Sequence, residues 1–349
     1  MRIAMSFAIA LLVSAAAHGE EARLPCGPGD KDCARAAAKA HVSKRPDFWK
    51  GAMARPVGER IGPAPPELLE LLALDNIAHG YPNKPRPARL TKEFLADVRR
   101  AFDEIPAVVK RRLDAKLAGI YFADDFGGTG FTDQVDTPAG APPLGFIVLD
   151  PSVLMQHTAN AWATWKDSTP FKPDRQWRLV ARIAEPAQDD RAHAIQYILL
   201  HEIAHVLSIG AGIHPSWTIA PRDAGAASEY PFFKLSWRIA GNHYASAFDA
   251  QFARRKDVVF YFGARLEAAA MPATYAALER TNFATLYGAT HPADDFAEAL
   301  ANYVHVVLMG KPFEIRVERN ARPVTTYRAC WAQARCRDKR QFLERFLGG

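Results

Sequence analysis

The chain has 349 residues, of which 49% are hydrophobic, and it carries a formal net charge of +6. This amount of apolar sequence is enough for a sizeable core, and the length allows one large domain or two ordinary ones. Lysine and arginine are spread along the chain without interleaved aromatic residues, which argues against a nucleic-acid-binding protein.

Residues 1–19 are typical of a secretory signal peptide. Met1 and Arg2 form a short basic start, residues 3–13 are almost wholly apolar, and small residues around Ala17 supply a cleavage site. The apolar run is too short to span a bilayer, and no later stretch is long and apolar enough to do so. We therefore expect a soluble protein without a membrane span that is periplasmic or secreted.

The four cysteines form two close pairs in the sequence, Cys26 with Cys33 and Cys330 with Cys336. Four cysteines allow three pairings, and the sequence alone does not choose between them. Local pairing is favoured because a Gly-Pro-Gly turn separates the first two. A zinc site of four thiolates is the alternative, but the pairs lack C-x-x-C spacing and an oxidising compartment disfavours free thiols. We predict two local disulfides.

Residues 20–90 are rich in proline and weakly patterned, so we expect an extended N-terminal segment with one short helix at 66–74. From Thr91, a helix-capping residue, an apolar stripe predicts a long amphipathic helix to about residue 117, kinked at Pro106. The stretch 156–176 is expected to be a packed surface loop. Apolar runs predict three strands of a small twisted sheet, at residues 119–123, 144–149 and 178–183.

The most informative stretch is His201-Glu202-x-x-His205, an H-E-x-x-H motif. It lies in a predicted helix over residues 188–209, which begins at two aspartates and ends before Gly210. Residues i and i+4 share a helix face with β-carbons about 6 Å apart, so both imidazoles can bind one metal ion. Glu202 is off that pair and can hold a water beside the ion. This is the arrangement of a zinc hydrolase with Glu202 as general base.

After the motif helix, the sequence predicts a loop over 211–231, helices at 234–252 and 265–280, and a further helix that starts at Pro292. Glu298 and Asn302 lie one turn apart on a polar face of this last helix. An acid on a second helix, beside an amide one turn later, is what a third zinc ligand with an orienting neighbour looks like. We therefore predict Glu298 as the third protein ligand of Zn²⁺.

Two other choices of third ligand stay open. His214 would suit the pattern H-E-x-x-H-x-x-G-x-x-H, but Ser208 occupies the glycine position and His214 comes three residues late. In the pattern G-T-x-D-x-x-Y-G an aspartate is the third ligand. The final Tyr-Gly of that pattern is present in this chain, but Ala284 occupies the aspartate position. The remaining choice is a different residue of the second helix: Asp294, Asp295 or His305.

The H-E-x-x-H motif and the downstream Asp-Asp-Phe-Ala-Glu helix together resemble the gluzincin metallopeptidases. Within them the chain resembles the group related to the catalytic domain of anthrax lethal factor, and exported bacterial proteins described as zinc peptidases. The resemblance covers roughly residues 90–310. It implies a zincin-like α+β domain at 91–310 with a mostly helical C-terminal part, followed by a tail at 311–349. It also implies a peptide or protein substrate.

Relatives of lethal factor place a tyrosine seven residues before the ligand glutamate. His291 holds that place relative to Glu298, and Tyr287 is one helical turn earlier, so the resemblance implies that Tyr287 or His291 stabilises a developing oxyanion. Gluzincins often carry an aspartate where this chain has Asn302.

Two other functions stay open. An envelope scaffold or binding protein would use the zinc for structure and would close the site with a fourth protein ligand, such as His291 or His305. A zinc hydrolase of a non-peptide bond would use the same residues on another substrate.

Overall fold

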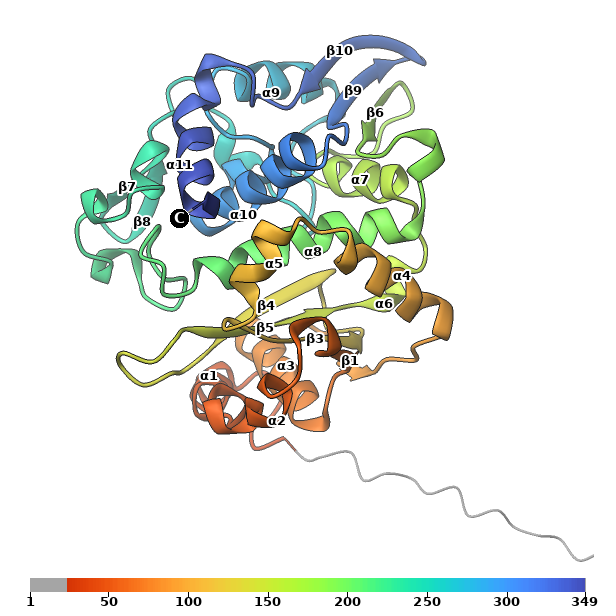
Figure 1. Ribbon diagram of the computed structural model, residues 1–349. Coiled ribbons are helices and arrows are strands. Elements are labelled where there is room, and N and C mark those ends of the chain that lie inside the picture. The colour runs from red at the N-terminus through yellow and green to blue at the C-terminus, as the bar shows by residue number, and fades with distance from the viewer. Residues whose placement is uncertain (1–23, 349) are drawn as a thin grey trace, which may run out of the picture.

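The computed structural model describes residues 24–348, so the predicted signal peptide lies outside the described residues. Helix α8 (Arg191–Ser208), which carries the H-E-x-x-H motif, runs through the middle of the molecule. In Figure 1 the main sheet and the helices of residues 31–79 lie below α8, and the C-terminal helices α9 to α11 and a second sheet lie above it. A site on α8 is therefore in reach of both layers.

The main sheet has five strands in the order β1-β3-β5-β4, with β2 paired to the end of β3. Strands β1, β3 and β5 are parallel to one another, whereas β4 is antiparallel to β5 and lies at the edge. Strands β3 and β5 are buried along almost their whole length, which explains the unbroken apolar runs that predicted them. The strands are β1 (Ile61–Pro63), β2 (Arg86–Pro87), β3 (Leu117–Asp124), β4 (Gly130–Val135) and β5 (Leu144–Leu149).

Successive side chains of a strand point to opposite faces of the sheet, and each face of this sheet has its own core. On one face, Ile120 and Phe122 pack in the main core with α4 and α8. On the other face, Tyr121 and Phe146 pack with α3 and with Trp49. The helices of this part of the chain are α1 (Lys31–Ala40), α2 (Lys50–Met53), α3 (Pro66–His79), α4 (Lys92–Asp103), α5 (Ala107–Leu113) and α6 (Pro151–Leu154).

The proline-rich N-terminal region is part of the main sheet and not a segment laid over it. Strand β1 pairs with β3 in parallel, with Ile61 opposite Ile120. A strand of three residues becomes recognisable only through its partner, which is why local pattern did not predict it. The predicted Cys26–Cys33 disulfide is present at the start of α1 and is confirmed.

The C-terminal layer combines helices with a sheet of three strands in the order β10-β9-β6 and a β7–β8 hairpin. The predicted Cys330–Cys336 disulfide is also confirmed and precedes the last helix. The helices are α7 (Ala159–Ser168), α9 (Met271–Leu278), α10 (Pro292–Tyr303) and α11 (Arg337–Gly348). The strands are β6 (Trp177–Arg182), β7 (Trp237–Ala240), β8 (His243–Ser246), β9 (Glu314–Arg319) and β10 (Arg322–Arg328).

Several predicted elements differ from the structure. The strand predicted at 178–183 exists as β6, but it pairs with β9 in the second sheet and not with the main sheet. The helix predicted at 234–252 is wrong, because that stretch forms the β7–β8 hairpin. The long helix from Thr91 is divided into α4 and α5 at Pro106, and 156–176 contains helix α7 instead of a loop throughout. The helix predicted at 265–280 is only partly present, because α9 covers just its later residues.

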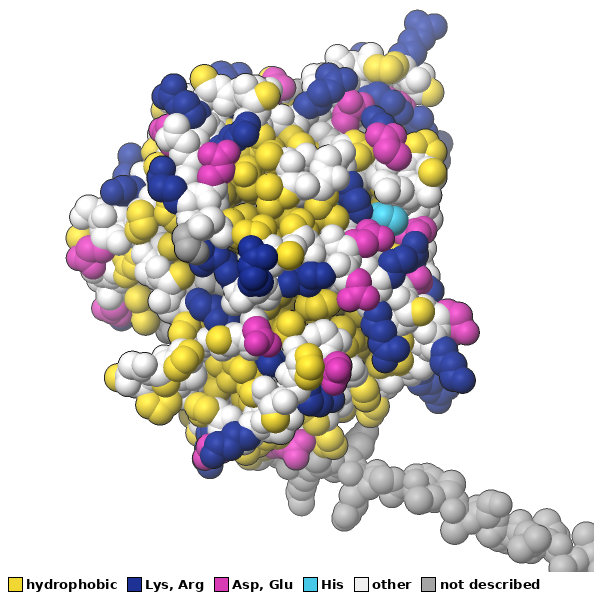
Figure 2. All heavy atoms as spheres, viewed as in Figure 1, with side chains coloured by type: hydrophobic (Ala, Val, Ile, Leu, Met, Phe, Trp, Pro, Cys, Tyr) yellow, Lys and Arg dark blue, Asp and Glu magenta, His cyan; other side chains and the backbone are white. Residues whose placement is uncertain are grey.

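The fold is thus mixed α/β, compatible with the predicted α+β class. Among the residues that the structure describes, no helix is long and apolar enough to cross a membrane. Figure 2 shows Lys and Arg scattered over the viewed face with Asp and Glu between them, which agrees with their spread along the sequence.

Candidate metal centre

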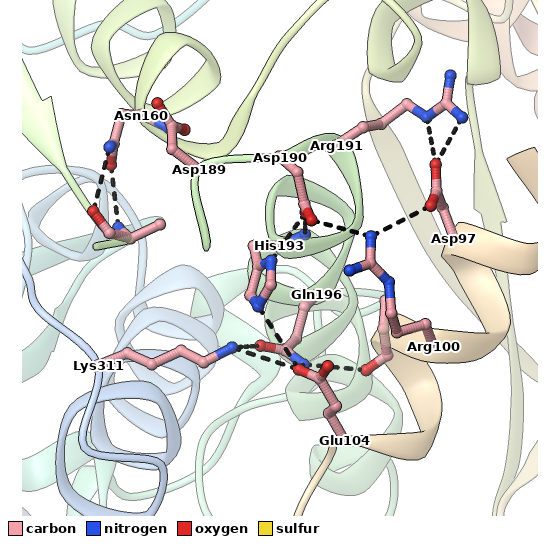
Figure 3. Close-up of polar contacts among 12 residues, drawn as sticks. Asp97, Arg100, Glu104, Asn160, Asp189, Asp190, Arg191, His193, Gln196 and Lys311 are labelled. Carbon is pink, nitrogen blue, oxygen red and sulfur yellow. Dashed lines mark hydrogen bonds and ion pairs between the residues drawn. The ribbon is translucent and has the colours of Figure 1, made fainter. Parts of the chain in front are cut away.

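The N-terminus of α8 is fixed by its capping residue Asp190, by Arg100 of α4 and by its own first residue, Arg191. Asp190 accepts a hydrogen bond from the backbone N–H of His193 at 3.0 Å and from Arg100 at 2.9 Å. Arg191 donates to Asp97 of α4 at 2.8 Å (Figure 3). These charge-assisted bonds hold the first turn of α8 against α4.

A second set of polar contacts fixes the next turn of the helix. The buried side chain of Gln196 donates to Glu104 at 2.9 Å and accepts from Lys311 (Figure 3). Nearby, Asn160 of α7 accepts from the backbone N–H of Ile183 at 2.7 Å. The motif helix is therefore tied to α4 and to the chain after α10 before the motif residues begin.

The two motif histidines face each other on α8. The Nε2 atoms of His201 and His205 lie 3.1 Å apart, and their ring centres are 4.8 Å apart. Nitrogen or oxygen donors about 2.0–2.1 Å from a tetrahedral zinc ion lie roughly 3.3 Å from each other. The spacing of the two nitrogens therefore suits a shared ion.

Asp294 is the acid that the structure brings to the histidine pair. Its Oδ1 lies 3.6 Å from Nε2 of His205 and 3.9 Å from Nε2 of His201. Within residues 24–348, these three side chains form the one group of three or more His, Cys, Asp or Glu residues whose ligand atoms all lie within 4.8 Å of one another. Burial raises the pKa of Asp294, but the histidines outweigh it and hold the pKa below its ordinary value. The group could hold a metal ion.

Glu298 lies one helical turn after Asp294, on the other side of His201. Its Oε1 is 3.0 Å from Nδ1 of His201 and accepts from Lys166 at 2.6 Å. Its Oε2 accepts from the hydroxyl of Thr285 at 2.7 Å. Burial raises the pKa of Glu298, but Lys166 and His201 lower it much further, so the carboxylate is ionised. A carboxylate this close to Nδ1 favours the tautomer with the proton on Nδ1 and the lone pair on Nε2, toward His205.

Glu202 is held by the edge strand β4. The hydroxyl of Thr132 donates to its Oε2 at 2.6 Å, and the side chain is 7% exposed. A Cβ atom on Gly130 would lie 2.2 Å from Oε1 of Glu202, so only glycine leaves room for the carboxylate there. Glu202 does not belong to the group that could hold a metal ion, and its role as a general base stays a prediction.

Tyr287 and His291 lie in different surroundings. The ring of Tyr287 stacks on His201 with centres 5.6 Å apart, and Nζ of Lys166 lies 4.9 Å from its centre. Burial and nearby acids raise the pKa of Tyr287 well above its ordinary value, which keeps its hydroxyl protonated as a donor. His291 caps α10 by accepting from the backbone N–H of Ala293 at 3.3 Å. Tyr287 is thus the better placed of the two for contact with a reacting group.

The other candidate ligands have different partners. Asp295 pairs with Lys339 and accepts from an indole N–H, and Nε2 of His305 contacts two carbonyl oxygens. His214 packs against Phe296 and its Nδ1 contacts the carbonyl of the next residue. Burial lowers the pKa of His214 to about 4, so its imidazole is neutral. None of these three joins the group around His201 in the described part of the chain.

A cleft of about 1220 Å³ opens beside this centre, and His201, Glu202, Tyr287 and Glu298 line it. Residues 126–131 line it from the lower layer, and parts of α7 and of the segment before α9 line it from the upper layer. Among the described strands β4 pairs only with β5, so its other edge is free of a strand partner. An extended chain could pair with that edge inside the cleft.

Sequence reasoning did not single out Lys166, Thr132 or Gly130. Lys166 lies 132 residues before Glu298, and nothing local marks it as the partner of a buried acid. Residues 130–135 follow a glycine-rich turn and include Phe, Thr and Val, which favour strands, and this is a signal for strand β4 that could have been used.

Comparison with known proteins does not assign this chain to a class. No family model, curated protein or solved structure matches it. The function is therefore inferred from the residues of the centre itself.

Proposed function

We propose that the protein is an exported zinc-dependent metallopeptidase of zincin-like architecture. The observation that carries the proposal is the grouping of His201, His205 and Asp294 beside a carboxylate, Glu202, that is held by other contacts. Two imidazoles and one carboxylate are a donor set of catalytic zinc sites, which keep one position for water. Two disulfides and the absence of a membrane-spanning helix among residues 24–348 agree with an exported protein.

We assign Asp294 rather than Glu298 as the third ligand. Glu298 contacts the nitrogen of His201 that faces away from His205, and this is the position of an orienting partner. The spacing implied by the lethal-factor resemblance supports the same assignment, since Tyr287 lies seven residues before Asp294 (294 − 287). That spacing makes Tyr287, and not His291, the candidate oxyanion donor.

Each residue of the centre has its own role in peptide hydrolysis. A zinc ion in this site would lower the pKa of water to about 7 and polarise the scissile carbonyl. Glu202 takes a proton from the attacking water and later gives it to the leaving amine. Thr132 holds Glu202 in position, Gly130 leaves room for its carboxylate, and the hydroxyl of Tyr287 donates to the developing oxyanion. The free edge of β4 aligns the peptide by strand pairing.

The test compares the mature wild-type protein with Glu202→Gln, which keeps the size of the side chain but removes the proton acceptor. Zinc content is measured by mass spectrometry, and hydrolysis is measured on a mixed peptide library with and without a chelator. We expect about one zinc in each protein and a loss of hydrolysis of roughly 10²–10⁴-fold in the variant. Hydrolysis that persists in Glu202→Gln would contradict the mechanism, even with zinc present.

A structural zinc site is the competing explanation. It would need a fourth protein ligand in place of water. Among residues 24–348 the buried Nε2 of His214 has no hydrogen-bond partner, so His214 is the candidate for this fourth ligand. If His214→Ala loses zinc and Glu202→Gln changes neither metal content nor activity, the scaffold function replaces the peptidase.

A further inference from the structure

Exposed aromatic side chains gather at the cleft. Trp165, Tyr261 and Phe262 keep 38%, 40% and 62% of their surface exposed, and all three line the cleft. Single exposed apolar residues are ordinary on a protein surface, but a group of them at a cleft is typical of a binding surface. Tyr81 also lines the cleft and stacks on Phe262. We call these four residues the aromatic rim.

The aromatic rim is connected to the metal centre through ring contacts. The rings of Trp165 and Tyr261 have centres 5.7 Å apart, and those of Tyr261 and Tyr287 have centres 6.1 Å apart. Tyr287 in turn stacks on His201. A group bound against Tyr261 therefore lies one ring away from Tyr287, so one bound molecule can contact the rim and the centre together.

The backbone at Tyr261 adopts a conformation that is rare for a residue with a side chain. Its φ is +66°, and the N–H of Phe262 donates to the carbonyl of Phe260 at 2.8 Å. A three-residue turn of this kind is strained, and such turns are kept where the surroundings fix them, often at functional sites. The turn directs the ring of Tyr261 to Tyr287 and the ring of Phe262 to Tyr81.

The contact between Phe262 and Tyr81 joins the two walls of the cleft. Tyr81 follows α3, which packs on the lower face of the main sheet, whereas Phe262 lies between β8 and α9 in the upper layer. Their rings are nearly parallel, at 10°, with centres 5.3 Å apart. Because Phe262 is still 62% exposed, much of this ring remains open to a ligand.

The chemistry of the cleft favours an extended peptide as the occupant. Gly130 and Phe131 of the free edge strand line the same cleft as the rim. A peptide paired with β4 projects alternate side chains to one side of the sheet, so one of them can meet the rim. Large apolar rings are attracted to aromatic faces more than small or charged side chains are.

We propose that the aromatic rim is a specificity subsite that selects peptides with an aromatic side chain near the scissile bond. This inference rests on the proposed peptidase function, and it names the substrate feature that the site recognises. Tyr261 and Phe262 contact the substrate ring, and Tyr81 holds Phe262 in place from the opposite wall.

The test measures peptide binding separately from hydrolysis. Zinc-free Glu202→Gln protein of full mature length is immobilised and offered a randomised heptapeptide library, and retained peptides are sequenced by mass spectrometry. We expect phenylalanine, tyrosine and tryptophan to be enriched about three- to tenfold at one position, the range expected for an aromatic pair. Phe262→Ala and Tyr81→Ala, made in the same background, lower this enrichment toward one, whereas Phe262→Tyr keeps it.

Val324→Ala is the matched control, because Val324 is 50% exposed but does not line the cleft. It leaves the enrichment unchanged, and thermal unfolding of every variant verifies folding. Absence of aromatic enrichment, retention of no peptide, or enrichment unaffected by Phe262→Ala and Tyr81→Ala would each overturn the proposal. Retention of N-acetylglucosamine oligomers in place of peptides would also overturn it and would indicate a carbohydrate subsite.

Hydrolysis of the same library by wild-type protein separates the two proposals. Cleavage without aromatic preference would contradict the proposed role of the aromatic rim but would support the proposed peptidase function. Selective binding of aromatic peptides without any cleavage by the zinc-loaded protein supports the rim and counts against the peptidase.

Discussion

Glu298 and His201 meet on the side of the imidazole that faces away from the second motif histidine. Oε1 of Glu298 lies 3.0 Å from Nδ1 of His201, while Nε2 of His201 lies 3.1 Å from Nε2 of His205. One ring thus has a carboxylate at one nitrogen and a possible metal position at the other. In metal sites this arrangement orients the ligand ring and makes its nitrogen more basic.

Substitutions of the two acids of α10 should affect zinc binding to different extents. Asp294→Ala removes a ligand and the charge that balances the metal, so zinc affinity should fall by far more than 100-fold. Glu298→Gln removes only the orienting carboxylate, and affinity should fall about 10- to 100-fold. Competition with a chromophoric chelator measures both. A larger loss in Glu298→Gln than in Asp294→Ala would return the ligand role to Glu298.

Gly130→Ala should separate activity from metal binding. The added Cβ would lie 2.2 Å from Oε1 of Glu202 and must displace the carboxylate, and its three nearest atoms all belong to Glu202. We expect zinc content close to that of the wild type and hydrolysis at least about 100-fold slower, the usual effect of a misplaced general base.

Gly62→Ala in strand β1 is the control for this change, since its Cβ would meet nothing within 4 Å. It should leave both zinc content and hydrolysis unchanged. If Gly130→Ala hydrolyses peptides at the wild-type rate, the placement of Glu202 by strand β4 does not matter for activity.

The buried histidine His305 should make stability depend on pH. Burial lowers its pKa from 6.5 to about 4, and its Nε2 contacts the carbonyls of Ile183 and Pro312. As the pH falls, the unfolded chain therefore takes up a proton at this histidine at a higher pH than the folded protein does. The stabilisation is complete above pH 6.5 and is lost as the pH falls toward 4, by up to about 3 kcal/mol.

Urea unfolding at pH 7 and pH 4.5 measures this effect. His305→Gln cannot titrate, so its free energy of unfolding should fall less between these two pH values than that of the wild type. Comparing how much the free energy of unfolding changes between the two pH values cancels any effect of the substitution that does not depend on pH. Equal changes in the two proteins would show that His305 does not account for the acid sensitivity.

The sequence by itself determined the part of the site that is local to one helix. Histidines four residues apart share a helix face whatever the helix packs against, and an aspartate at the N-cap fixes where that helix begins. For this reason the sequence alone places His201, Glu202 and His205 on one helix, and it puts the start of that helix near Asp189 and Asp190; the structure starts α8 at Arg191, with Asp190 as the cap. The short cysteine separations likewise predicted both disulfides.

Only the tertiary structure decided which acid of α10 approaches the histidine pair. Asp294 and Glu298 are four residues apart and share a helix face, so no local pattern distinguishes them; the packing of α10 against α8 does. The same holds for Lys166, which reaches Glu298 across 132 residues, and for β4, which positions Glu202 through Thr132. Such contacts depend on how helices and strands pack together, because a side chain's reach is a few ångströms while its partner lies anywhere along the chain.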